Sequence, residues 1–381
     1  MTMMITATKQ WRLRKKPYST PVLEGEDSTF ELVTAPLDSL KEGQVLLKAV
    51  YLSNDPAQRS WISPLSDPER SYLPPLEPGD PMRSLGIGEV VESRSDAFPV
   101  GTLVVAITGW SEFSIHDTEG LTPLRAPEGL RETHFLGALG LPGFTAYYAL
   151  TQIVDLKKSN VLVVSAAAGA VGSMVVQIAK KVLGSNVRAQ VIGFAGTEAK
   201  CRWVESLGAD LCLNYKAATF HDDLVQATRG FVDVFFGNNA LLHNYRPIGR
   251  MRTLKIDSGE LDNVGGEILD LVLKRMNKFG RIAACGTISN YNRDADLAGL
   301  KNFYEVITMR LKVLGFINVD WLDHLGEVTN VLVEEWRKGN LLIRDENETV
   351  VDTVFEDIPK TWMMLFEGRN TGKLITRLTV S

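Results

Sequence analysis

The spacing of hydrophobic positions along the chain changes near residue 150. Before that point the apolar runs are short and are separated by Pro and Gly, which is typical of a β-rich domain. Between about residues 155 and 320, short runs rich in β-branched residues alternate with helix-like segments. This alternation predicts an open parallel sheet with helices on both faces. We therefore expect an α/β protein with a β-rich domain over 1–150 and a doubly wound parallel sheet over 151–344.

The apolar runs also give bounds for individual elements. In the β-rich part we expect strands at 44–52, 88–93 and 102–108. In the second part we expect strands at 160–165, 189–194, 233–236, 280–285 and 312–317, and helices at 172–183 and 197–207.

A turn of small residues follows the strand expected at 160–165. It runs from Ser165 to Gly172 as Ser-Ala-Ala-Ala-Gly-Ala-Val-Gly and opens a helix, which is the context of a dinucleotide-binding turn. Small residues let the backbone approach a pyrophosphate, and the helix N-terminus presents N–H groups to it. Ala167 replaces the first glycine of the G-x-G-x-x-G pattern, which leaves Gly169 and Gly172. Such a turn can also serve helix–strand packing alone, and we favour the cofactor interpretation.

The residues after the second strand indicate which dinucleotide binds. Sites for NAD place Asp or Glu at the end of this strand to hold the ribose 2′-hydroxyl. Here the strand continues into Ala-Gly-Thr (195–197), and Lys200 and Arg202 lie just beyond. A cation at this place can neutralise a 2′-phosphate, so we expect NADPH. Two observations weigh against this: both cations can simply solvate a helix face, and Glu198 lies close by.

Composition narrows the class of protein. The 381 residues suit two domains, and 45% hydrophobic with 23% charged residues is typical of a globular protein. A net charge of −5 gives no general attraction to nucleic acid or to anionic membranes. The N-terminal segment lacks the apolar core of a signal peptide, and no run approaches the ~18 apolar residues of a membrane helix. We therefore expect a cytoplasmic protein that binds neither nucleic acid nor membrane.

The cysteines and histidines do not form a pattern for a metal site. Cys201, Cys212 and Cys285 form no C-x-x-C pair, and all three fall in the second domain. No Cys and no Gly-His-Glu segment occurs before residue 150. His116 and His134 are isolated, and we interpret them as ordinary surface or hydrogen-bonding residues. We expect no metal.

Ordered motifs over nearly the whole chain carry a resemblance to a known family. They are LSNDPAQR (52–59), GIGEVVES (86–93), LPGFTAYYAL (141–150), VSAAAGAVGS (164–173), NYK (214–216), DNVGGEILD (262–270), CGTISNYN (285–292), ITMRLKVLGF (307–316) and GRNTGK (368–373). With these motifs the chain resembles the zinc-independent medium-chain dehydrogenases/reductases. Within them it is similar to the leukotriene B4 12-hydroxydehydrogenase/prostaglandin reductase group, with its alkenal double-bond reductases and curcumin reductase.

The resemblance implies a GroES-like substrate domain over 1–150, to which the chain returns over 345–381, and a Rossmann domain for NADPH over 151–344. The residues implied around the pyrophosphate are Gly169, Ala170, Val171 and Gly172. Lys200 and Tyr215 are implied at the 2′-phosphate. The residues implied around the ribose and nicotinamide are Asn263, Cys285, Gly286, Thr287, Ile288, Ser289, Asn290, Tyr291, Phe316, Ile317, Asn318 and Asn370. A homodimer through 310–316 is implied as well.

One motif departs from the family. Where relatives have Asp-Pro-Tyr-Met-Arg, this chain has Asp-Pro-Ala-Gln-Arg from Asp55 to Arg59. Ala57 therefore removes a ring and a hydroxyl near the implied substrate pocket. For this reason the family's choice of substrate does not transfer to this chain.

The chemistry of a metal-free pocket favours conjugate reduction. Reduction of a carbonyl to an alcohol lacks its usual electrophile when no Lewis acid is present. When hydride adds to the β-carbon of an enone, negative charge spreads to the carbonyl oxygen, which needs only one or two donors. Tyr291 is the candidate donor, acting with the ribose 2′-hydroxyl, because a phenol with a pKa near ~10 donates while neutral. The alternative is that Tyr291 only contacts ribose or packs; Tyr51 and Tyr147 are weaker pocket candidates.

The family pattern is interrupted after the strand expected at 233–236. Relatives continue directly into D-N-V-G-G-E, whereas here the segment 237–261 precedes Asp262. Structureless segments longer than ~12–15 residues are uncommon in compact domains, and this one leaves the strand end where the cofactor is expected. It is either a surface insertion, such as a substrate lid, or the translation of a retained in-frame intron, which we favour. Transcript reads running through codons 237–261 as the dominant species would contradict the intron.

These observations favour NADPH-dependent reduction of the carbon–carbon double bond of α,β-unsaturated ketones or aldehydes. A quinone reductase or secondary-alcohol dehydrogenase on the same fold is the alternative enzyme, since a fold does not determine a function. The interruption at 237–261 leaves a third possibility, a catalytically silent protein that binds nucleotide or acts structurally.

Overall fold

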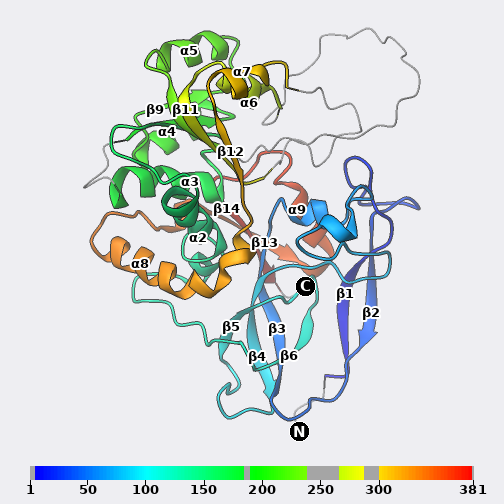
Figure 1. The fold of residues 1–381 in the computed structure, drawn as a ribbon. Coiled ribbons are helices and arrows are strands. Elements are labelled where there is room, and N and C mark those ends of the chain that lie inside the picture. Colours follow the sequence, from blue (N-terminus) through cyan, green and yellow to red (C-terminus); the bar gives the residue numbers. More distant parts are fainter. Residues whose placement is uncertain (1–4, 184–188, 238–265, 287–299, 380–381) are drawn as a thin grey trace. The chain divides into compact units, whose positions relative to one another are not determined.

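The computed structural model describes residues 5–183, 189–237, 266–286 and 300–379 (Figure 1). The chain forms two compact units. The first consists of Met1–Tyr147, Gly169–Met174 and Asn318–Ser381, and the second of Tyr148–Ala168 and Val175–Ile317. The chain thus returns to the first unit at Asn318, whereas the sequence led us to expect this return at residue 345. The reason is α8 (Leu325–Arg337), where the Thr329 hydroxyl donates to the Leu139 carbonyl at 3.1 Å.

The second unit is built on a six-stranded sheet in the order β12-β11-β10-β7-β8-β9. Every neighbouring pair is parallel. The strands are β7 (Val161–Val164), β8 (Gln190–Ala195), β9 (Leu211–Asn214), β10 (Val232–Gly237), β11 (Met276–Ala284) and β12 (Lys312–Gly315). The helices are α4 (Glu198–Ser206), α5 (Phe220–Ala227), α6 (Gly266–Leu273) and α7 (Tyr304–Thr308), and α3 (Ala170–Gln177) begins in the first unit.

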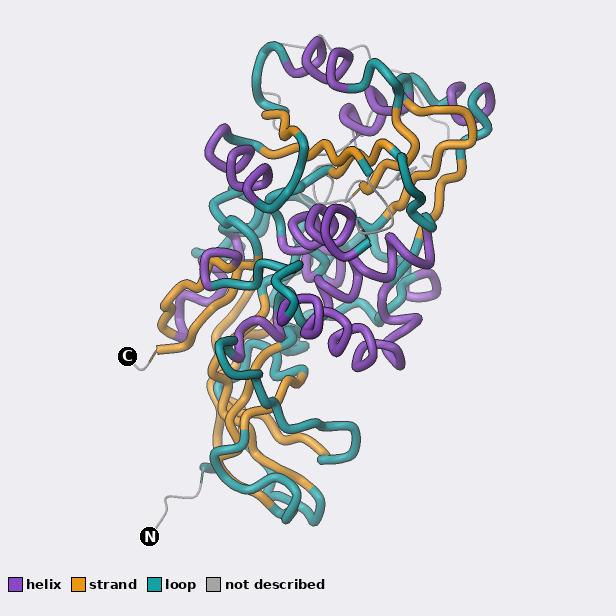
Figure 2. Tube along the Cα trace, turned by 90° about the vertical axis from the view of Figure 1, so that its left-hand side faces the viewer, coloured by secondary structure: helices purple, strands orange, loops and turns teal. Residues whose placement is uncertain are grey.

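Helices cover both faces of this sheet (Figure 2). Along β8, Ile192 and Phe194 belong to the core that α5 and α6 share with the strands, and the Phe194 and Phe220 ring centroids lie 5.2 Å apart. Gly193 faces the other way, where a Cβ would lie 2.8 Å from the Val204 side chain of α4. The alternation of side chains along the strand therefore separates the two helical layers, and the predicted doubly wound parallel sheet is confirmed.

The first unit is rich in strands, as predicted. One sheet follows the order β13-β14-β3-β4-β5 with β6 paired to β3, and β1 pairs with β2. The strands are β1 (Ala7–Leu13), β2 (Phe30–Pro36), β3 (Gln44–Ser53), β4 (Gly86–Ser93), β5 (Leu103–Ala106), β6 (Phe113–Asp117), β13 (Glu348–Val354) and β14 (Lys373–Thr379). The helices are α1 (Gln58–Trp61), α2 (Leu141–Tyr148, whose last residue begins the second unit), α8 and α9 (Ile358–Met363).

The C-terminal segment completes the core of the first unit. β14 pairs antiparallel with β3 and parallel with β13. Trp362 of α9 is fully buried, and its ring centroid lies 5.7 Å from that of Trp110 and 6.0 Å from that of Phe30. Large aromatic side chains dominate core energetics, so the end of the chain is an integral part of this unit.

Candidate active site

The turn after β7 is held by backbone hydrogen bonds to both neighbouring strands. The Ser165 N–H donates to the Phe236 carbonyl at 3.0 Å, and the Ala167 N–H donates to the Phe194 carbonyl at 2.9 Å. Ala166 between them has a φ of +47°, a conformation that costs energy for any residue except glycine. The neighbouring strands thus impose the turn, and such strain is typical of functional sites.

The replacement of the first glycine by Ala167 has a structural counterpart on β8. A Cβ at Gly193 would lie 3.0 Å from the Ala167 Cβ. The methyl group of Ala167 therefore fits because the facing residue has no side chain. The departure from G-x-G-x-x-G is compensated by a glycine on the neighbouring strand, so it does not argue against a dinucleotide turn.

The second half of the turn belongs to the first unit, where it meets the loop before β14. Gly169 forms an isolated parallel bridge with Gly372, and the Asn370 side-chain amide donates to the Gly372 carbonyl at 2.8 Å. Gly372 has a φ of +64°, and a Cβ there would lie 1.7 Å from the Asn347 carbonyl oxygen. Only glycine fits at this position. Two of the predicted cofactor residues, Gly169 and Asn370, thus both contact Gly372.

A cationic turn follows β8, as the sequence predicts for a 2′-phosphate. Thr197 caps α4 by accepting from the Lys200 N–H at 3.2 Å. The Tyr215 hydroxyl lies over Gly196, where a Cβ would approach it to 2.9 Å. Burial and then the positive charge of Lys216 lower the pKa of the Lys200 ammonium. Two lysines that repel each other favour a bound anion, which would stabilise the charge on both.

The acid that weighed against a phosphate, Glu198, has a hydrogen-bond partner at the end of β9. The Asn214 side-chain amide donates to Glu198 Oε1 at 3.0 Å. The Asn214 Oδ1 atom in turn accepts from the Lys216 N–H at 3.0 Å. Glu198 thus has a partner of its own at the end of β9. Lys216 was missed in the sequence, although it lies in the quoted NYK motif.

Several residues predicted around the nicotinamide lie outside the described part of the chain: Asn263, Thr287, Ile288, Ser289, Asn290 and Tyr291. Of the others in the second unit, Cys285 follows β11 and its N–H donates to the Gly237 carbonyl at 2.9 Å, and Gly286 follows it. Burial raises the pKa of the Cys285 thiol to about 12, so it stays neutral. Phe316 is buried after β12, and Ile317 ends the unit.

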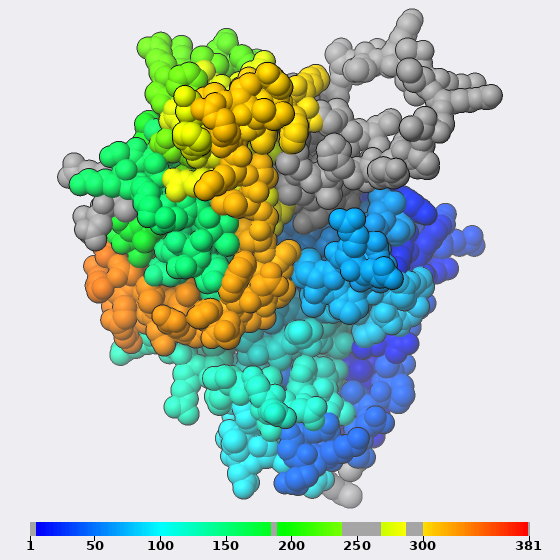
Figure 3. Space-filling view, viewed as in Figure 1, coloured from blue at the N-terminus to red at the C-terminus, as the bar shows by residue number. Residues whose placement is uncertain are grey.

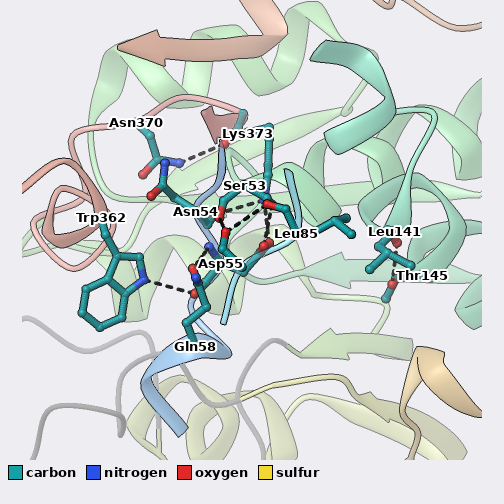
Figure 4. Close-up of polar contacts among 12 residues, drawn as sticks. Ser53, Asn54, Asp55, Gln58, Leu85, Leu141, Thr145, Trp362, Asn370 and Lys373 are labelled. Atoms are coloured by element: carbon teal, nitrogen blue, oxygen red, sulfur yellow. Dashed lines mark hydrogen bonds and ion pairs between the residues drawn. The ribbon is translucent and has the colours of Figure 1, made fainter. Parts of the chain in front are cut away.

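Asn318 belongs to the first unit. Its side-chain amide donates to Thr145 Oγ1 at 3.0 Å. The Thr145 hydroxyl in turn donates to the Leu141 carbonyl at 2.7 Å; Figure 4 shows these two residues. α2 therefore orients this predicted cofactor residue.

Side-chain hydrogen bonds and an ion pair hold the loop after β3 (Figure 4). The buried Lys373 ammonium donates to Asp55 Oδ1 at 2.5 Å and to the Asn54 carbonyl at 3.0 Å. The Ser53 hydroxyl donates to Asp55 Oδ2 at 2.5 Å. The Asp55 N–H donates to Gln58 Oε1 at 2.8 Å. The first residue of β14 therefore fixes the loop that carries the Asp-Pro-Ala-Gln-Arg motif.

The weaker pocket candidates from the sequence have other surroundings. Tyr51 packs against the buried Ile87, Leu136 and Ile375. Burial, together with the negative charges of Glu327 and Glu335, raises the pKa of Tyr147. Neither residue joins the hydrogen bonds around Asp55 that the structure describes.

The side chains present do not fit a zinc site in the described part of the chain. No group of three or more His, Cys, Asp and Glu residues there could hold a metal ion. His116 Nε2 lies 2.8 Å from Ser114 Oγ, and the buried His134 Nδ1 lies 2.8 Å from Glu348 Oε1. Both histidines thus have hydrogen-bond partners.

Comparisons with known proteins identify the family. A family model described as the N-terminal domain of oxidoreductase matches residues 9–124, and one described as zinc-binding dehydrogenase matches residues 170–243. Prostaglandin reductase 1 of Bos taurus is 35% identical over 97% of this chain and 98% of its own length. NADPH-dependent curcumin reductase of Escherichia coli is 32% identical over 97% and 96%.

The solved structures agree. CurA from Vibrio vulnificus, solved alone and in complex with NADPH, matches 98% of this chain with a TM-score of 0.80 and 31% identity. The chain covers 99% of the first structure and 100% of the second. The chain therefore belongs to the medium-chain dehydrogenase/reductase family, in its prostaglandin reductase and curcumin reductase branch, and the predicted resemblance is confirmed. Among the described residues, no helix is long and apolar enough to span a membrane.

Proposed function

We propose that this chain is an NADPH-dependent reductase of the carbon–carbon double bond in α,β-unsaturated ketones or aldehydes. The observation that carries the proposal is the turn after β8, where the Tyr215 hydroxyl lies over Gly196 and the charge of Lys216 acts on Lys200. Such a turn suits a 2′-phosphate. The names of the relatives, prostaglandin reductase and NADPH-dependent curcumin reductase, support the same cofactor and reaction type.

Different residues of the chain would bind the cofactor and the substrate. The backbone from Gly169 to Gly172 would hold the pyrophosphate at the start of α3, and the two lysines would hold the 2′-phosphate. Bound NADPH supplies the hydride for the β-carbon of the substrate. Tyr291 would donate a hydrogen bond to the substrate oxygen, where negative charge develops.

The test is NADPH oxidation assayed with an enone, a quinone and a saturated ketone, using the full chain and the form that lacks 237–261. We expect turnover of the enone and little of the other two. If only the quinone or the ketone is reduced, the proposal fails. A folded protein that shows no NADPH binding in a fluorescence titration would instead be a silent member of the family.

Replacing Lys200 by Ala is expected to raise the KM for NADPH by about 10-fold to 100-fold, because a charge-assisted contact with phosphate is lost. The KM for NADH should stay within about twofold, since NADH has no 2′-phosphate. Arg202→Ala is the matched control: Arg202 is exposed on the same helix, and its loss should change neither KM. If Arg202→Ala raises the KM for NADPH more than Lys200→Ala does, the contact with the phosphate must be assigned to Arg202.

We also propose a homodimer through β12. β12 is an edge strand of its sheet, and the segment around it lies at the surface (yellow to orange in Figure 3). Phe279, Ile307 and Val313 are apolar side chains exposed by 62%, 63% and 37%. An exposed edge with apolar neighbours favours pairing with another strand. Sedimentation equilibrium should show a dimer that Val313→Lys converts to monomer; a monomeric parent protein would contradict the proposal.

A further inference from the structure

Asn54, the first residue after β3, is fixed on three sides within the first unit. Its N–H donates to the Leu374 carbonyl at 3.2 Å, and its carbonyl accepts from the Lys373 ammonium at 3.0 Å. Its side-chain Nδ2 donates to Thr376 Oγ1 at 3.0 Å. The residue is 2% exposed. All three contacts are to β14, so the orientation of this amide is set by the C-terminal strand.

The two polar atoms of the Asn54 side-chain amide differ in their hydrogen bonding. The Asn54 Oδ1 atom is buried and has no hydrogen-bond partner among the described residues. Buried polar groups are nearly always hydrogen-bonded, because an unpaired acceptor loses its bonds to water and gains none in return. An apolar residue of similar size would avoid this cost. The presence of an unpaired acceptor at this position is therefore explained if a bound molecule supplies the missing hydrogen-bond donor.

The position of Asn54 indicates which molecule that is. The Lys373 that holds it follows Gly372, which bridges to Gly169 of the phosphate turn. Asn370, a predicted neighbour of the ribose and nicotinamide, donates to the same Gly372 (Figure 4). The loop 370–373 thus connects the unpaired acceptor to two residues predicted to contact the dinucleotide.

We propose that Asn54 Oδ1 accepts a hydrogen bond from an N–H or O–H donor of the bound ligand, in the first place the carboxamide NH2 of the nicotinamide ring. Lys373 is the positioning residue that holds the Asn54 backbone. The proposal rests on the proposed use of NADPH and adds a contact that determines how the ring is oriented. A hydroxyl of the substrate offers the same donor chemistry, and the experiment distinguishes the two sources.

The test compares NADPH with its reduced 3-acetylpyridine analogue, in which a methyl ketone replaces the carboxamide and the donor is missing. Dissociation constants are measured by protein fluorescence, so the result does not depend on turnover. The parent protein should bind NADPH about tenfold more tightly than the analogue. In Asn54→Leu this ratio should fall close to one. Asn54→Asp, which keeps an acceptor, should retain most of it.

Thr376→Val is the matched control, because it removes the other partner of the same amide and leaves the acceptor in place; its ratio should stay near that of the parent. If the ratio persists in Asn54→Leu but the KM difference between a hydroxylated enone and its deoxy counterpart disappears, the donor is on the substrate. If a folded Asn54→Leu protein changes neither comparison, the inference is overturned. A parent protein that binds NADPH but reduces no enone would refute only the proposed reaction, since the coenzyme comparison still holds.

Discussion

Replacing Asp55 by Asn is expected to lower the free energy of unfolding by about 3 kcal/mol, because it leaves the buried Lys373 ammonium without a counter-charge. The Lys373 side chain is 3% exposed and its Nζ lies 2.5 Å from Asp55 Oδ1. Its other described contact, the Asn54 carbonyl, carries no net charge. The Asp55 side chain is 35% exposed, so the reverse change, Lys373→Met, leaves a carboxylate that water can reach and should cost less.

Urea unfolding at constant pH measures this effect, provided the slope against urea stays unchanged. Asp352→Asn is the control: it breaks the ion pair with Arg377, in which both side chains are about half exposed. Exposed pairs contribute little, so this variant should lose less than about 1 kcal/mol. The double variant Asp55→Asn with Lys373→Met should recover most of the loss. Equal small losses at Asp55 and Asp352 would contradict the assigned importance of the buried pair.

This ion pair also illustrates what the sequence could not predict. Lys373 and Asp55 both lie in motifs that carried the family resemblance, yet they are 318 positions apart. Hydrophobic periodicity shows which face of a strand is buried, but it does not show which distant strand lies beside it. A lysine at the start of a strand is usually solvated. Only the pairing of β14 with β3 brings its ammonium to a carboxylate.

The bounds of individual strands were predicted better than the contacts between distant strands. The predicted strands at 160–165, 189–194 and 233–236 match β7, β8 and β10 to within a residue or two at each end, because buried parallel strands form short continuous β-branched runs. The helix expected at 172–183 begins at Ala170, and its last residues, Ile178–Val182, form a wider helical turn.

Within the candidate site, the sequence singled out the turn at Gly169 and the cation Lys200 because both come shortly after strands, and their roles stay predictions. The compensation between Ala167 and Gly193 was not, since the two residues face each other across neighbouring strands. The segment 237–261 shows the same limit. Beyond Gly237 it lies outside the described residues, and the choice between insertion and intron stays a prediction.

Replacing Tyr291 by Phe is expected to lower kcat for enone reduction by about 100-fold to 1,000-fold, which is the usual cost of removing one donor to a developing oxyanion. The ring remains, so packing and the KM for NADPH should change little. The physical reason is that the hydrogen bond strengthens only as charge moves onto the substrate oxygen, so its loss affects the transition state and not ground-state binding. Steady-state rates with a saturating enone measure the effect.

Tyr215→Phe provides the matched comparison, because it removes a hydroxyl from the turn at Gly196. A Cβ on Gly196 would lie only 2.9 Å from that hydroxyl. A hydroxyl at the 2′-phosphate contributes to binding alone, so this variant should raise the KM for NADPH several-fold and leave kcat unchanged. The two substitutions thus separate a donor to the reacting oxygen from a donor to the cofactor. If Tyr291→Phe instead changes only the KM for NADPH, Tyr291 is a ribose contact, and the oxyanion must be held by another group.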